Sequence, residues 1–323
     1  MLLLHKSMSS TENIKRASVI GLGTMGPGIV ATLASGGMLV SAYDTSEEAC
    51  EQADEKIKMA SNVLYSLGSG YDMQPDITLT SNLEECVRKA DLVLETIPEN
   101  LSLKLDLFSE LEAIVSGDCI LASDSSGIPV SQLQDGAVNS SRFVGMHWSN
   151  PPHIIPMIEV IAGKYTSPGV IDDMTACIRR LNLIPVVVKK DIPGFVENRV
   201  LYALLRECID LVDQDVIEAK DLDTCVSWGI GYKLAAIGPM ALLDMAGLDI
   251  YQAVGSYLNK DLCSRPDVSD TIHAKISAGN LGMKTGRGIY TYSQEDIDSL
   301  RKMRAKLLVD TRKVLDAATD PTE

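Results

Sequence analysis

The chain has 323 residues, enough to bury a sizeable core and to form two domains rather than one. Its formal net charge of −15 argues against a nucleic-acid surface, which needs clustered cations. Seven cysteines without a CxxC pair indicate reduced thiols rather than disulfides or a zinc site, so no metal is expected. No apolar run approaches the roughly 18 residues that span a bilayer, and the opening leucines are too few for a signal sequence. We therefore expect a soluble cytoplasmic protein with no membrane partner and an N-terminal extension at residues 1–14.

A glycine-rich turn follows the first apolar strand. The stretch GLGTMG (21–26) lies between that strand and a helix, and a second strand then ends in Asp44. In a dinucleotide-binding turn the first glycine makes the tight bend, the second leaves room for a pyrophosphate, and the third lets helix and strand approach closely. Asp44 can accept hydrogen bonds from both ribose hydroxyls and would repel a 2′-phosphate. We predict NAD as the cofactor, bound by Gly21, Gly23, Thr24, Met25, Gly26 and Asp44.

Strands and helices alternate over the rest of the first half. The pattern predicts helices at 45–67, 83–90, 101–115 and 167–180, and strands at 76–82, 90–98, 119–125, 142–148, 156–163 and 184–190. TSEE (45–48) is typical of a capping box, and Gly68 begins a glycine-rich stop. The alternation favours an α/β domain with a Rossmann-type doubly wound sheet over residues 15–192, whose ligand lies at the carboxyl ends of the strands.

Polar residues gather near those strand ends. His147 ends one strand, Glu159 lies in the next, and Ser126 and Asn198 follow other strands. A histidine held by a carboxylate has a fixed tautomer and a raised pKa, which suits a base that removes a hydroxyl proton near neutral pH. A serine and an asparagine beside it could orient the hydroxyl and the developing carbonyl oxygen. The alternative is that His147 is a satisfied core group.

Residues 193–323 are predicted to be helical throughout. Apolar positions recur at helical spacing, and the stripe from Leu201 to Leu211 is interpreted as domain or dimer core rather than as a ligand site. A further amphipathic helix is predicted beyond Tyr292. We expect an all-α domain for substrate binding and dimerisation.

Several motifs together resemble the 3-hydroxyacyl-CoA dehydrogenase family. They run from about Lys15 to Tyr292 and comprise GLGTMG, ADLVLETIPENLSLK, SDSSGI, GMHWSNP, IEVI, DIPGFVENRVL, GPMALLDMAGLD and KTGRGIY. The resemblance implies NAD-linked interconversion of a 3-hydroxyl and a 3-keto group, an all-helical C-terminal domain and a homodimer formed through that domain.

The resemblance also assigns individual residues. It implies a catalytic dyad of His147 with Glu159, and it gives Ser126 and Asn198 to the substrate. It places Asn150 near the junction of nicotinamide and substrate. The residues that it implies near the cofactor are Glu99, Lys104 and Lys284. The family's usual Asn-Thr-Ser is replaced by Asp124-Ser125-Ser126, which leaves open the choice of serine.

We expect an L-3-hydroxyacyl-CoA as the substrate, with a free 3-hydroxy acid as the alternative. An L-3-hydroxyacyl-CoA is the most widespread family substrate, but a CoA site needs cations, and the helix after the second strand offers only Lys56 and Lys58. The doubled proline at 151–152 and the longer GIGYKLAAIGPM resemble L-gulonate and L-carnitine dehydrogenases, which oxidise free hydroxy acids. Lys233 would then anchor a substrate carboxylate, or else be a solvated lysine. A third hypothesis, of another class, is a non-catalytic NAD-binding or crystallin-like structural protein.

Overall fold

The computed structural model describes residues 14–68 and 76–318. The chain divides into two compact units between Asn198 and Arg199, downstream of the predicted boundary after residue 192. Residues 1–13 of the predicted N-terminal extension, and Ser69 and Gly70 of the predicted helix stop, lie outside the described residues.

An eight-stranded sheet forms the centre of the first unit, in the order β3-β2-β1-β4-β5-β6-β7-β8. The strands are β1 (Arg16–Ile20), β2 (Leu39–Tyr43), β3 (Ile77–Thr80), β4 (Leu92–Glu95), β5 (Ile120–Ser123), β6 (Phe143–Trp148), β7 (Met157–Ile161) and β8 (Ile184–Val188). β1 to β6 run parallel, whereas β7 is antiparallel to β6 and parallel to β8. The predicted Rossmann-type class is confirmed. The connection at 149–156 is too short for the dozen residues of a parallel crossover, which accounts for the reversal at β7.

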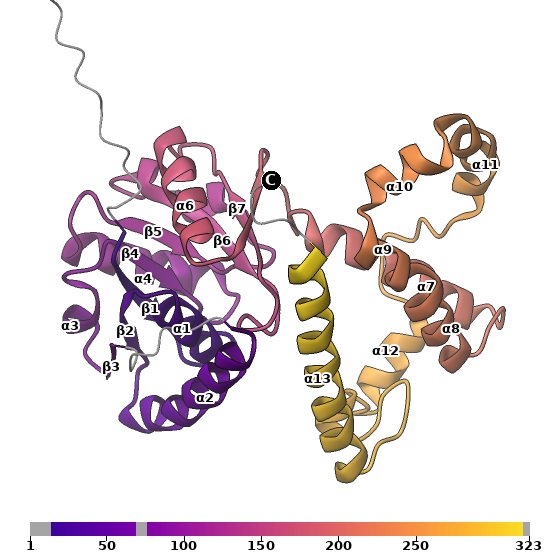
Figure 1. Ribbon diagram of the computed structural model, residues 1–323, viewed down its shortest axis with the longest axis horizontal. Coiled ribbons are helices and arrows are strands. Elements are labelled where there is room, and N and C mark those ends of the chain that lie inside the picture. Colours follow the sequence, from indigo (N-terminus) through magenta and orange to yellow (C-terminus); the bar gives the residue numbers. More distant parts are fainter. Residues whose placement is uncertain (1–13, 69–75, 319–323) are drawn as a thin grey trace, which may run out of the picture. The chain divides into compact units, whose positions relative to one another are not determined.

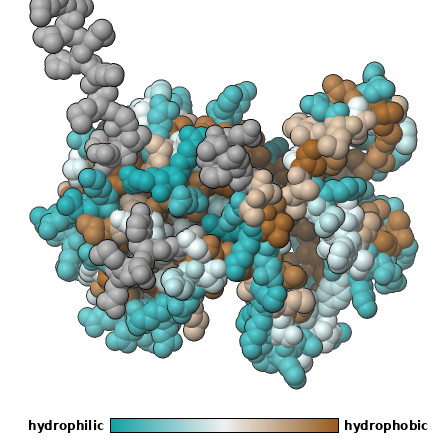
Figure 2. Space-filling view, in the orientation of Figure 1, coloured by the Kyte–Doolittle hydropathy of each residue, from teal (hydrophilic) through white to brown (hydrophobic). Residues whose placement is uncertain are grey.

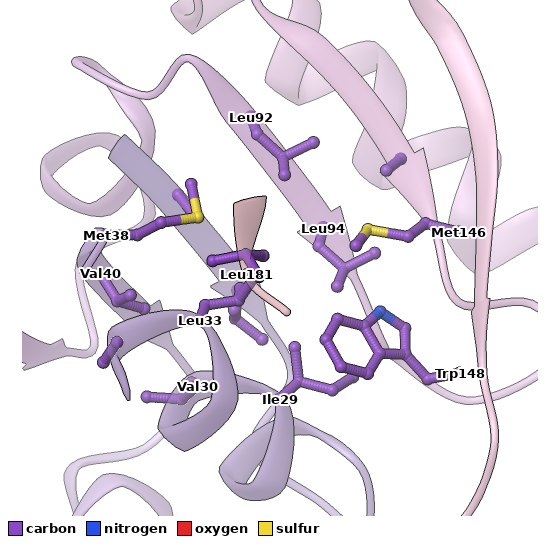
Figure 3. Packing of buried hydrophobic residues seen from close by; sticks show 14 of the residues in the cluster. Ile29, Val30, Leu33, Met38, Val40, Leu92, Leu94, Met146, Trp148 and Leu181 are labelled. Carbon is purple, nitrogen blue, oxygen red and sulfur yellow. The ribbon is translucent and has the colours of Figure 1, made fainter. Parts of the chain in front are cut away.

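Helices cover both faces of this sheet (Figure 1). They are α1 (Gly26–Ser35), α2 (Glu47–Ser66), α3 (Leu83–Val87), α4 (Leu101–Ile114), α5 (Val130–Leu133) and α6 (Pro168–Arg180), with a short 3-10 turn η2 (Ser140–Arg142) before β6. Buried residues of α1, α2 and α6 share one apolar cluster, and those of α3, α4 and α5 share another. Val19 belongs to the first cluster and its neighbour Ile20 to the second, as alternation along a strand requires. Figure 3 shows Trp148, Leu94 and Ile29 packed in the first cluster.

The N-terminus of α2 lies one residue later than the predicted capping box. Ser46, not Thr45, is the N-cap, and its side chain accepts the backbone N–H of Ala49. Thr45 is committed elsewhere, because its N–H and hydroxyl both donate to Asp44. The contacts of Thr45 with Asp44, the residue after β2, are consistent with a helix that begins after Ser46.

The second unit is helical, as predicted. It contains most of α7 (Glu197–Asp213), and α8 (Ala219–Cys225), α9 (Tyr232–Ala236), α10 (Pro239–Ala246), α11 (Leu248–Asp261), α12 (Asp270–Ser277) and α13 (Gln294–Ala318). A π-helical segment η3 (Val226–Gly231) joins α8 to α9, and a 3-10 turn η4 (Met283–Thr285) follows α12. α13 is the amphipathic helix predicted beyond Tyr292.

Within the described residues, no single helix combines the length and the apolar character needed to cross a membrane. Only the pair 219–236 and 239–246, bent by 93°, meets those two criteria together.

Candidate active site

The glycine-rich turn has the geometry that a dinucleotide requires. Gly21 has φ +99°, which favours glycine, and a Cβ on Gly26 would lie 2.1 Å from the carbonyl oxygen of Gly21. At Gly23, by contrast, a Cβ would meet nothing within 4 Å. The first and third glycines are therefore required by the fold itself, whereas the open space beside Gly23 fits a pyrophosphate at the start of α1.

This contrast gives a testable prediction for two alanine variants. Gly26→Ala should lower the melting temperature markedly, because the new Cβ forces two backbone segments apart. Gly23→Ala should melt normally but bind NADH roughly ten- to hundredfold more weakly, as expected for about 1–3 kcal/mol of steric conflict with the ligand. Thermal melting and NADH fluorescence titration measure the two effects. Gly169→Ala is the control, since a Cβ there also meets nothing within 4 Å. Early melting of Gly23→Ala would contradict the assignment.

Asp44 connects the end of β2 to the turn. Its Oδ2 accepts the backbone N–H of Leu22 at 2.8 Å, and its Oδ1 accepts the N–H of Thr45 at 2.7 Å. The carboxylate is thus held beside the turn, where the additional lone pairs of its oxygens can accept ribose hydroxyls.

Glu99 organises the loop after β5. Its Oε1 accepts the Ser125 hydroxyl at 2.6 Å and the backbone N–H groups of Ser126, Gly127 and Ile128 at 3.1, 2.8 and 3.2 Å. Ser125 is buried and committed to this loop, whereas Ser126 is exposed and its hydroxyl makes no hydrogen bond within the described residues. Of the two serines left open by the sequence, Ser126 is the one free to contact a substrate.

Lys104 lies inside the protein rather than at its surface. Its ammonium donates to Glu95 Oε1 and to the carbonyl of Ile97, and it lies 3.5 Å from Glu99 Oε2. Glu95 also accepts the Ser123 hydroxyl at 2.7 Å. The side chain of Lys104 is 1% exposed and that of Glu95 is completely buried. In these contacts Lys104 supports the ends of β4 and β5 and neutralises the carboxylates around it.

The dyad His147–Glu159 is assembled by strand pairing. The antiparallel register of β6 and β7 places these two residues directly opposite each other, and His147 Nδ1 lies 2.7 Å from Glu159 Oε2. Because an ionised carboxylate can only accept, Nδ1 carries the hydrogen and Nε2 remains available as a base. Glu159 Oε1 accepts the backbone N–H groups of Val196 and Glu197, so one carboxylate positions both the imidazole and the start of α7.

Acidic residues surround the imidazole. Burial alone would lower the pKa of His147, but the hydrogen bond to Glu159 and the charges of Asp124, Glu159 and Glu197 outweigh it and raise the pKa above its usual value. For Glu159, burial is outweighed by the bonds from His147 and from two backbone N–H groups, which lower the pKa of its carboxyl. Ligand atoms of His147, Glu159 and Glu197 all lie within 4.8 Å of one another. The raised pKa makes the neutral imidazole a better proton acceptor than an unperturbed histidine.

Asn198, at the end of the first unit, lies beside the serine loop. Its Nδ2 donates to the carbonyl of Ser126 at 2.9 Å. Asn150 is exposed just after β6. Together these contacts bring His147, Glu159, Ser126 and Asn198 to one end of the sheet. Lys233 on α9 and Lys284 on η4 are exposed residues of the second unit, and their roles stay predictions.

Comparisons with family models cover most of the chain. The model of the 3-hydroxyacyl-CoA dehydrogenase NAD binding domain matches residues 16–192, and that of the C-terminal domain matches residues 194–292. The chain belongs to the 3-hydroxyacyl-CoA dehydrogenase family. It is an NAD-dependent oxidoreductase, as the resemblance implied, and α13 lies beyond the part that the family models match.

Relatives differ in their named substrates. The chain is 52% identical to a 5-formyl-3-hydroxy-2-methylpyridine 4-carboxylate 5-dehydrogenase of Mesorhizobium japonicum, over 94% of this chain and 99% of the relative. A crystal structure of an enzyme of that activity, described as an NAD+ dependent dismutase, superposes with a TM-score of 0.91 at 52% identity, covering 94% of this chain and 99% of the other. A probable 3-hydroxybutyryl-CoA dehydrogenase of Deinococcus radiodurans is 34% identical over 85% of this chain and 99% of its own. An L-carnitine dehydrogenase of Streptomyces coelicolor is 32% identical over 74% of this chain and 76% of its own.

Two carboxylates near the imidazole were not foreseen from the sequence. Glu197 accepts the Ser149 hydroxyl at 2.5 Å, and Asp124 accepts the backbone N–H of Trp148 at 2.8 Å. The only signal in the sequence was the departure at Asp124 from the family's asparagine.

Proposed function

We propose that this protein is an NAD-dependent dehydrogenase of a small free carboxylic acid, and that its substrate is a carboxylated pyridine that reacts at a formyl or hydroxymethyl carbon. The observation that carries the proposal is the 52% identity, over nearly the whole of both chains, to the Mesorhizobium enzyme named for such a substrate. The narrower expectation of an L-3-hydroxyacyl-CoA has weaker support.

The charge of α2 argues against a CoA thioester. This helix carries Lys56 and Lys58 as its only cations, against five acidic residues, and Lys58 is paired with Asp54. The 3′-phosphate and pyrophosphate of CoA need cations that this helix does not supply. A small carboxylate requires a single anchor, for which Lys233 is the candidate predicted from the sequence.

The chain's own residues account for the acid–base part of the reaction. His147 Nε2 removes the proton of the substrate hydroxyl, and Glu159 stabilises the resulting imidazolium through Nδ1. The Ser126 hydroxyl and the Asn198 amide, linked through the Ser126 carbonyl, can hold the substrate oxygen. NAD+ bound at the glycine turn and Asp44 would act as the hydride acceptor.

A substrate panel tests this function. We expect kcat/KM for 5-formyl-3-hydroxy-2-methylpyridine-4-carboxylate to exceed that for 3-hydroxybutyryl-CoA by roughly 100-fold or more, about 3 kcal/mol of differential transition-state binding. L-carnitine and L-gulonate complete the panel, with NADH formation as the readout. The highest kcat/KM on 3-hydroxybutyryl-CoA would reverse the proposal, and would favour a role in fatty acid metabolism. Intact NADH binding without turnover of any compound would favour the non-catalytic alternative.

We also propose a homodimer formed through the second unit, in a cytoplasmic location. Helices α7 to α12 contain no buried residue among those described, and they expose large apolar side chains such as Tyr202, Trp228 and Tyr251. Figure 2 shows apolar surface on this unit. A second copy of the chain would cover such surface. All seven cysteines are free thiols, which suits a reducing compartment.

A further inference from the structure

Asp124 carries a carboxylate beside the imidazole of His147. The proposed acid–base reaction does not use this carboxylate. It follows β5 directly, and its backbone N–H donates to the carbonyl of Glu95 at 2.9 Å. Its Oδ1 accepts the N–H of Trp148, the residue after His147 on β6, at 2.8 Å. Asp124 is thus fixed at the end of the sheet where the dyad lies.

The charge of Asp124 is not needed for this position. An asparagine, which the family usually has here, would accept the Trp148 N–H equally well through its side-chain oxygen. The side chain is half-buried, and its second oxygen, Oδ2, makes no hydrogen bond within the described residues. This oxygen keeps its acceptor capacity, so a ligand hydroxyl that donates a hydrogen bond to it would be bound favourably.

The groups that influence the charge of Asp124 come from three elements. His147 on β6 and Lys104 on α4 favour its charged form, as does the Trp148 N–H, whereas Glu95 on β4 opposes it. Burial is the largest influence and raises the pKa of the Asp124 carboxyl to about 7. Around the imidazole itself the other carboxylates are Glu159 on β7 and Glu197 on α7. Asp124 is therefore available as a hydrogen-bond acceptor at and above neutral pH.

We propose that Asp124 binds the second hydroxyl of a hydrated aldehyde, and that this contact adapts the site to oxidise aldehydes to acids. The inference rests on the proposed function, in which the reacting carbon carries a formyl group. A geminal diol has two hydroxyls on one carbon: His147 removes the proton of the first, while Asp124 accepts a hydrogen bond from the second. The carbon then loses its hydrogen as hydride to NAD+, giving a carboxylic acid, NADH and one proton. A hydrogen bond to Asp124 increases electron donation to the carbon that loses hydride.

Asp124→Asn provides the test, because it keeps the bond to Trp148 and removes the charge. Aldehyde oxidation with NAD+ and aldehyde reduction with NADH are measured on 5-formyl-3-hydroxy-2-methylpyridine-4-carboxylate. Reduction uses the unhydrated aldehyde, which has no second hydroxyl. We expect kcat/KM for oxidation to fall about ten- to hundredfold more than that for reduction, the effect of one hydrogen bond to a charged group. Asp106→Asn, an exposed acid on α4, is the matched control and should leave the ratio unchanged.

A binding measurement supplies a readout that does not depend on turnover. 5-Trifluoroacetylpyridine-4-carboxylate is hydrated in water and mimics the geminal diol. Calorimetry should show Asp124→Asn binding it about tenfold more weakly than the wild type, with a smaller change for the trifluoroethanol derivative, which has one hydroxyl. If the variant does not fold, the wild type still decides: equal affinity for the two compounds would overturn the inference.

The outcomes separate the two proposals. A wild-type protein that neither oxidises nor reduces the aldehyde contradicts the proposed function. A wild-type protein that does both, with a variant that loses both equally, contradicts the role of Asp124 alone.

Discussion

Glutamine in place of His147 is expected to lower kcat by roughly 10²–10⁴-fold, the range for loss of a general acid–base group. The imidazole is the only group in the dyad that can exchange a proton with the substrate, because Glu159 is occupied by Nδ1 and by two backbone N–H groups. NADH binding should be retained, since the glycine turn and Asp44 make no hydrogen bond with His147 within the described residues. Steady-state kinetics and NADH fluorescence titration measure the two properties.

The pH dependence of the wild type provides a second check on His147. Oxidation needs the neutral imidazole, so its kcat/KM should fall as pH drops through a pKa above the usual value of about 6.5. Reduction needs the imidazolium, so it should fall as pH rises through the same pKa. His273→Gln, on the exposed surface of α12, is the control for loss of a histidine. If His147→Gln kept activity within a few-fold of the wild type, the base would have to be another group.

The local part of the fold could be predicted from the sequence because it depends on short-range chemistry. The glycine turn, the alternation of strands and helices and α13 all follow from spacing and residue type within a few residues. The reversal at β7 could not be predicted from periodicity, since a buried strand has the same pattern in either direction. A prediction of the reversal would have had to consider the length of the connection between β6 and β7.

The sequence indicated candidate residues for the site, but it did not indicate the hydrogen bonds that join them. His147 and Glu159 were recognisable as an acid–base pair, yet their contact depends on the β6–β7 register, which is a property of the folded sheet. Glu99, which lies 26 residues before Ser125, binds the Ser125 hydroxyl, so the structure favours Ser126 for the substrate, and that role stays a prediction. Long-range contacts of this kind leave no local pattern, so their partners appear only when the strand ends are brought together.

Methionine in place of Lys104 is expected to destabilise the protein by about 3–5 kcal/mol, the cost of leaving a buried charge without its partner. Glu95 is completely buried, and its hydrogen bonds from Ser123 and from the Ile97 N–H do not neutralise it. The double variant Glu95→Gln/Lys104→Met removes the unpaired charge and should recover most of the loss, because the neutral amide can accept the Ile97 N–H through its oxygen and donate to the Ser123 hydroxyl oxygen through its NH2 group. Urea unfolding at neutral pH measures all three proteins.

The comparison of single and double variants decides between two roles for Lys104. Lys58→Met breaks an exposed pair with Asp54 and is the control, for which no measurable loss is expected. If the double variant were as unstable as Lys104→Met, the destabilisation would arise from the contacts of Lys104 with Ile97 and Glu99 rather than from the charge of Glu95. If Lys104→Met were as stable as the wild type and instead bound NADH more weakly, the cofactor role implied by the family resemblance would account for this lysine. Recovery in the double variant would mean that the lysine acts by neutralising Glu95, and so by holding the ends of β4 and β5 where the site is built.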